Sequence, residues 1–219
     1  MINKDYILRM AEKIGRSLAI ILGLRKYNQH EEALIYIDDT LLRTVGLTSR
    51  FINSISDEML VTTISPIGVL NIEACLWIAA LLKTEGDIYE EDLDKGNESY
   101  YRYQKSLYLF LTAVLQEHIP TDADLYKDIE QLLQKLDDYE LPLSLKSKLF
   151  AYYELSGQYA KAEDTLFDLL ETGNNREMVE SGRAFYTRLL AKSDADLQAG
   201  NLARDEVNEG LAQLKRMKF

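Results

Sequence analysis

The sequence is poor in residues that interrupt helices and in residues that bind metals. Its 219 residues include three prolines, eleven glycines, two histidines and one cysteine. So few breakers favour long uninterrupted segments, and helices tolerate such a composition best. No stretch shows the sustained alternation of a β-strand between turn signals. The sequence therefore predicts an all-α protein.

Apolar residues recur at steps of three and four along most of the chain, the spacing of one helix face. Short loops between such helices predict antiparallel helix pairs, because each apolar stripe must be covered by the next. We expect one all-α domain over residues 1–219, arranged as an array of helix pairs or as a helical bundle. The expected helices cover about residues 5–27, 31–45, 57–64, 66–81, 98–118, 125–136, 145–153, 159–169 and 178–189, with a last one after Gly200.

Two helix starts carry specific capping signals. Asn28 stands three residues before Glu31, which resembles a capping box. Ser56 is followed by two acidic residues, the usual composition of a first helical turn. We therefore expect the second helix to be capped by Asn28 and a short helix to begin after Ser56.

Acidic residues outnumber basic ones, and the excess is uneven. The formal net charge is −11, and residues 1–50 carry eight basic and six acidic side chains, so residues 51–219 carry −13. A negative surface repels phosphate backbones and anionic lipid heads. Neither nucleic acid nor a membrane is expected as a main partner, whereas a basic or neutral protein or peptide is compatible with this charge.

The segment 84–97 interrupts the helical pattern. It holds six carboxylates against one lysine, with Gly86 and Gly96 near its ends. Self-repulsion and a shortage of apolar residues favour an exposed, mobile connector. If the chain is subdivided, we expect the subdivision at this acidic connector.

No motif indicates catalysis, a metal or a cofactor. His30 and His118 belong to no paired metal-binding motif, and Asp92-x-Asp94-x-Gly96 misplaces the glycine of a calcium loop. A phosphate-binding loop and a nucleophile elbow are also missing from the sequence. We therefore expect no catalytic residues, no metal site and no cofactor, and a protein that is not an enzyme.

Two apolar runs are too short to cross a bilayer. The run 17–24 lacks a following small-residue cleavage site, so it predicts the buried face of a first helix rather than a signal peptide. The run 74–82 predicts a central buried helix, and Cys75 within it predicts a buried thiol. A single cysteine fits a reducing compartment, so we expect a cytoplasmic protein.

Tyrosines cluster at the start of the helix expected at 98–118. Tyr100 and Tyr103 continue the core stripe, while Tyr101 and Tyr108 lie seven residues apart on a neighbouring face. Tyrosine suits interfaces because it combines apolar area with a hydrogen-bonding tip. Tyr101 and Tyr108 are therefore candidate partner-binding residues, although a wide core-facing stripe explains them as well.

The segment 149–169 resembles a tetratricopeptide repeat. Leu149 and Tyr153 occupy the Leu and Tyr positions of its first helix, Ala162 and Leu166 stand for Ala-x3-Phe in its second, and Gly157 lies at the turn. Lys146 and Phe150 stand where the pattern has Trp and Gly. A fainter match covers residues 20–37, with Ile20, Leu24, Ala33 and Ile37.

The resemblance implies a helix-pair array that offers a surface to a partner. Ligand-facing positions in such a pair lie on its first helix, here Ser147, Ala151 and Glu154. The leading hypothesis is a non-catalytic module or scaffold that binds a protein or peptide. The alternative is a regulator that senses a peptide or small molecule and lacks its own output domain. The oligomeric state is left open by the sequence.

Overall fold

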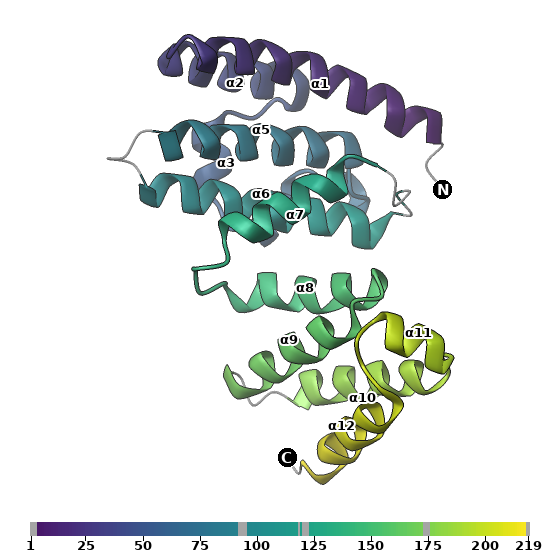
Figure 1. The fold of residues 1–219 in the computed structure, drawn as a ribbon. Coiled ribbons are helices and arrows are strands. Elements are labelled where there is room, and N and C mark those ends of the chain that lie inside the picture. Colours follow the sequence, from purple (N-terminus) through teal and green to yellow (C-terminus); the bar gives the residue numbers. More distant parts are fainter. Residues whose placement is uncertain (1–3, 92–95, 118, 120–122, 173–175, 218–219) are drawn as a thin grey trace. The chain divides into compact units, whose positions relative to one another are not determined.

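A computed structural model describes residues 4–91, 96–117, 119, 123–172 and 176–217, and every regular element in these ranges is helical. The predicted all-α fold is confirmed. The helices are α1 (Lys4–Lys26), α2 (His30–Val45), α3 (Ser49–Ser54), α4 (Asp57–Thr63), the 3-10 turn η1 (Pro66–Gly68), α5 (Ile72–Glu91), α6 (Gly96–Gln116), α7 (Leu125–Lys135), α8 (Leu143–Leu155), α9 (Tyr159–Thr172), α10 (Arg176–Leu190), α11 (Asp194–Ala199) and α12 (Arg204–Arg216) (Figure 1). None of them is long and apolar enough to cross a membrane.

The chain forms two compact units, residues 1–140 and residues 141–219. In the first unit α5 is the central helix, packed on α6 and covered by α1 and α2 (Figure 1). Ile78, Leu81 and Leu82 are fully buried on it. A helix that is apolar nearly all round needs neighbours on every side, so the central helix predicted from the run 74–82 is confirmed.

The second unit pairs α8 with α9 and packs α10 against both α9 and α12. Its core is aromatic: Phe150 and Phe185 meet edge to face with centroids 5.3 Å apart, and Tyr186 is fully buried beside them. A Cβ atom on Gly210 would lie 2.3 Å from the Tyr186 ring, so α12 can approach α10 this closely only with glycine at that position. Ala162, fully buried in α9, is a second small residue in this core.

The prediction of an exposed, mobile connector at residues 84–97 is largely wrong. Residues 84–91 continue α5 without a break, and Thr84, Glu85, Gly86 and Ile88 are buried. The reason is a close approach of α6, since a Cβ on Gly86 would lie 2.6 Å from the Tyr103 ring. Residues 92–95 lie outside the described ranges, and α6 already begins at Gly96. The division between the two units falls instead after Glu140.

Of the two capping residues predicted above, Ser56 is confirmed and Asn28 is not. The Ser56 hydroxyl accepts from the Met59 N–H at 3.2 Å and caps α4. The Asn28 prediction is wrong, because Gln29 holds the N-cap position of α2 without a side-chain bond, and Asn28 adopts a left-handed φ of 56° in the turn. Asparagine tolerates that conformation better than most residues, so Asn28 serves the turn rather than the cap.

Candidate functional site

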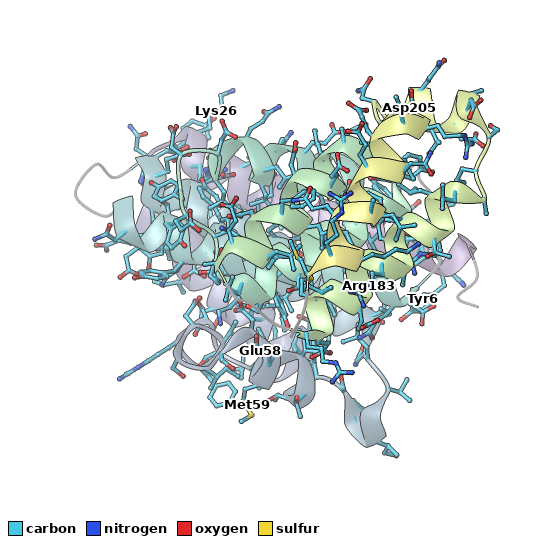
Figure 2. The ribbon with its side chains drawn as sticks, turned by 90° about the horizontal axis from the view of Figure 1, so that it is seen from below. Tyr6, Lys26, Glu58, Met59, Arg183 and Asp205 are labelled. Atoms are coloured by element: carbon cyan, nitrogen blue, oxygen red, sulfur yellow. The ribbon has the colours of Figure 1, made fainter. Side chains whose placement is uncertain are left out.

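A cleft with a volume of about 940 Å³ lies among α2, α3, α4, α5 and α6 of the first unit. Glu58, on its α4 wall, is labelled in Figure 2 beside its neighbour Met59. Volumes of this size are typical of ligand pockets. The charged residues that line it are Asp38, Asp39, Arg50, Asp57, Glu58, Glu85, Glu98, Arg102 and Lys105.

Two carboxylates from distant helices meet at Ser49 in the cleft. Thr48 caps α3 by accepting from the Phe51 N–H at 3.2 Å, and Ser49, as the first residue of α3, has an N–H without an acceptor in the helix. Asp38 of α2 accepts that N–H with Oδ1 at 2.6 Å. The Ser49 hydroxyl lies 2.8 Å from both Oε1 and Oε2 of Glu85 of α5. Ser49 therefore bridges the carboxylates of α2 and α5.

Glu85 is a buried charge with incomplete compensation. It is 3% exposed, and its nearest cation is Arg102, whose Nε lies 3.5 Å from Oε1. Burial raises the pKa of Glu85, the Arg102 charge and the Ser49 hydroxyl oppose that rise, and Asp38 adds to it. The net direction is upward, so desolvation outweighs the attraction of Arg102.

Arg102 is held from three sides. It forms an ion pair with Glu98 one turn earlier on α6, in addition to its approach to Glu85. Its guanidinium carbon lies 4.6 Å from the centroid of the Tyr89 ring, a cation–π contact. The cleft thus already accommodates one guanidinium group between carboxylates and an aromatic ring.

A second buried ion pair closes one wall of the cleft. Lys105 Nζ lies 3.1 Å from Asp57 Oδ1 and donates to the Ile55 carbonyl at 2.6 Å. Gln104 donates to Asp57 Oδ2 at 3.0 Å. Both carboxylate oxygens of Asp57 are therefore engaged, and this cluster ties the start of α4 to α6.

Two polar atoms of the cleft lack a hydrogen bond. Among the described residues, three buried side-chain nitrogen or oxygen atoms have no hydrogen-bond partner, and two of them belong to the cleft residues Asn53 and Arg102. The Asn53 amide nitrogen donates to the Ser49 carbonyl and hydroxyl, which leaves Oδ1 without a donor. Arg102 Nε is close to Glu85 but outside hydrogen-bond geometry. Unsatisfied buried groups are rare in folded proteins and often mark a functional site.

Tyr101 and Tyr108, the two tyrosines predicted to bind a partner, differ in their exposure to solvent. Tyr101 is 57% exposed and lines the cleft, with its ring edge to face on Tyr100 at 5.2 Å. Tyr108 is 6% exposed, and burial, with Glu58 and Asp57 adding to it, raises its pKa to about 12. Asp57 and Glu58 belong to α4, which packs on α6, so Tyr108 is buried where Tyr101 is exposed.

The other three predicted binding residues lie on α8 of the second unit. Ser147, Ala151 and Glu154 are each half-buried and follow one another at helical spacing. The Ser147 hydroxyl donates to the Leu143 carbonyl at 2.9 Å. Glu154 accepts from Arg188 of α10 at 2.6 and 2.7 Å, a bidentate pair. Both polar side chains among the three residues, those of Ser147 and Glu154, therefore have partners within the unit.

Sequence reasoning missed Asp38, Ser49, Glu85 and Arg102. One signal was present for Glu85, which follows Leu81 by four residues and Leu82 by three and so lies on the buried side of α5. Its partners come from α3 and α6, and no local pattern specifies them.

The described residues contain no group of three or more His, Cys, Asp and Glu placed to hold a metal ion. Fold and cleft together define an all-α protein with a cleft between helices that is lined largely by charged and polar residues. The chain belongs to a family of unknown function, DUF6483, whose model matches residues 1–218. Neither the curated proteins nor the solved structures contain a significant match to it.

Proposed function

We propose that the protein is a non-catalytic interaction module that binds a segment of a protein or peptide in the cleft of its first unit. The observation that carries this proposal is the cleft itself, which combines exposed apolar side chains with buried charged groups. Ile35 is 63% exposed and Tyr101 57% exposed at its edge. Apolar contact area around a few fixed polar groups is the usual composition of a recognition site.

The second unit supports the same class of function. Its α8–α9 pair carries the tetratricopeptide-like residues, with Ala162 fully buried and Leu149 and Leu166 in the core. A helix pair of this kind serves protein binding in the family that it resembles. Within this proposal the protein works in the cytoplasm, where the buried thiol of Cys75 remains reduced.

Selection from a displayed library of random peptides tests the proposal. The full chain is compared with Tyr101→Ala, which alters the cleft, and with Tyr27→Ala, an exposed tyrosine outside the cleft lining. Peptides selected on the wild type should bind Tyr101→Ala at least about tenfold more weakly, the effect of losing one aromatic contact. They should bind Tyr27→Ala unchanged. Equal loss in both variants, or no enriched peptide, contradicts the proposal.

The alternative function, sensing of a small molecule, is favoured by the cleft volume of about 940 Å³, which lies within the range of small-molecule sites. Native mass spectrometry of the protein purified from its host distinguishes the two functions. A bound small molecule of constant mass, lost in Glu85→Gln, would favour the sensor.

A further inference from the structure

We propose that the cleft recognises a positively charged group of its ligand, the guanidinium or ammonium of a basic side chain, between Glu85, Asp38 and Asn53. This inference rests on the proposed function and names the chemistry by which the site selects its ligand. All the groups involved belong to the first unit, on α2, α3, α5 and α6.

Glu85 accepts fewer hydrogen bonds than its carboxylate can take. Both of its oxygens lie 2.8 Å from the same Ser49 hydroxyl, which has only one hydrogen to donate. An ionised carboxylate accepts about four hydrogen bonds. Among the residues that the structure describes, the nearest further donor is Arg102 Nε at 3.5 Å, which does not meet hydrogen-bond geometry. Glu85 can therefore accept further hydrogen bonds from a ligand.

The acceptor atoms of the side chains next to Glu85 also lack donors. Asn53 Oδ1 is buried without a hydrogen bond. Asp38 accepts from the Ser49 N–H through Oδ1, and no donor from the described residues is found at its Oδ2. Asn53 and Asp38 both bond to Ser49, which also bonds to Glu85, so the three acceptors surround one residue. Several unfilled acceptors around one point fit a group with several N–H donors.

The cleft is lined by an excess of acidic residues and by two aromatic rings. The cleft has six carboxylates and three cations. Lys105 and Arg102 are both paired with carboxylates, and the third cation, Arg50, is exposed. Tyr89 and Tyr101 add two rings, one of which already contacts the guanidinium of Arg102. An excess of carboxylates with aromatic walls favours a cation and repels an anion.

The test is a titration of the ¹⁵N-labelled full chain with defined probes, followed by backbone amide shifts. The probes are the peptide acetyl-Gly-Ala-Arg-Ala-Gly-amide, the same peptide with citrulline in place of arginine, and acetyl-arginine amide. Citrulline keeps the shape of arginine without its charge. The arginine peptide should shift the amides of Ser49, Asn53, Glu85 and Arg102 and saturate. The citrulline peptide should bind at least about tenfold more weakly, the usual effect of losing a charged hydrogen bond.

Two variants locate the effect. Glu85→Gln removes the charge at nearly the same shape, and Asp38→Asn keeps an oxygen that can accept the Ser49 N–H. Each should weaken the arginine peptide at least about tenfold. The matched control is Glu163→Gln, a carboxylate of the second unit that accepts from the Tyr186 hydroxyl at 2.6 Å. The control should bind the peptide as the wild type does, and dispersed amide spectra verify that each variant is folded.

Each outcome is informative. Equal binding of the citrulline and arginine peptides overturns the inference and leaves peptide binding standing. Equal binding of acetyl-arginine amide and the arginine peptide supports the cation site but contradicts a peptide ligand, and so points to a free small cation. The absence of saturable shifts with all three probes overturns the inference, as does unchanged binding in both Glu85→Gln and Asp38→Asn.

Discussion

The two units treat buried polar groups differently. The first unit buries Asp57, Glu85 and Lys105 beside its cleft, whereas Lys146 is the single buried charged residue in the described part of the second unit, whose core cluster consists of apolar and aromatic residues. Burying charges costs free energy that ion pairs only partly return, whereas aromatic packing stabilises directly. We therefore expect the aromatic core to stabilise the second unit strongly and the buried charges to lower the stability of the first.

The largest expected effect is in the aromatic core of the second unit. Phe185 is fully buried against Phe150 and Tyr186. Phe185→Ala should lower the free energy of unfolding by about 3–5 kcal/mol, because it removes transfer energy and leaves a cavity. Urea unfolding followed by circular dichroism measures the loss. A loss below about 1 kcal/mol, the range of surface sites, would show that this core is not the main support of the unit.

A change at the α8–α9 crossing is expected to be smaller. Ala162 is fully buried in the same core cluster, so Ala162→Leu should overpack the pair and cost about 1–3 kcal/mol. Ala162→Gly serves as a control that removes volume instead of adding it. An unchanged urea midpoint for Ala162→Leu would contradict the tetratricopeptide-like packing of these two helices.

The third prediction concerns the charge in the first unit. Because burial raises the pKa of Glu85, ionised Glu85 destabilises the folded state above that raised pKa. The destabilisation disappears as pH falls through the raised pKa toward the ordinary glutamate value of 4.5. Glu85→Gln should therefore raise the unfolding midpoint at pH 7 and remove this part of the pH dependence. The fluorescence of Trp77, which lies on the same helix, reports the transition.

A lower midpoint in Glu85→Gln at pH 7 would show that its ion pair with Arg102 outweighs its burial. The buried carboxylate would then be a structural element like Asp57, and the contrast between the units would weaken.

The smallest effect is expected at the cleft edge. Tyr101 is largely exposed, so Tyr101→Ala should change the free energy of unfolding by no more than about 0.5 kcal/mol. Urea unfolding of this variant beside Tyr103→Ala gives a direct contrast, since Tyr103 is 2% exposed and donates to Asp87 at 2.9 Å. A large loss in Tyr101→Ala would mean that its ring supports the fold rather than a ligand.

The sequence was enough to predict the fold class and most helix positions, because apolar spacing alone specifies them. The acidic segment was misread because carboxylates were counted without regard to helix face. Glu85 and Ile88 lie on the buried side of α5, and Gly86 admits the Tyr103 ring. The short helix α11 was missed as well, although Ser193 and Asp196 form a capping box at its start.

The candidate site was much harder to predict. Tyr101 alone was both predicted and found at the cleft. Tyr108 lies seven residues after Tyr101 on α6, but it is buried where α4 packs on α6. Helical spacing alone does not predict which part of a helix a distant element will cover. The bond between Ser49 and Glu85 joins residues 36 positions apart, so it becomes visible only when α3 and α5 are placed together.

Glu85→Gln, measured twice on the same sample, tests the central claim most directly. At pH 7 the unfolding midpoint from Trp77 fluorescence and the affinity for acetyl-Gly-Ala-Arg-Ala-Gly-amide are both compared with the wild type. The account predicts a higher midpoint together with binding weakened at least about tenfold. A lower midpoint with unchanged binding would contradict it, because the buried charge would then serve the fold and not a ligand.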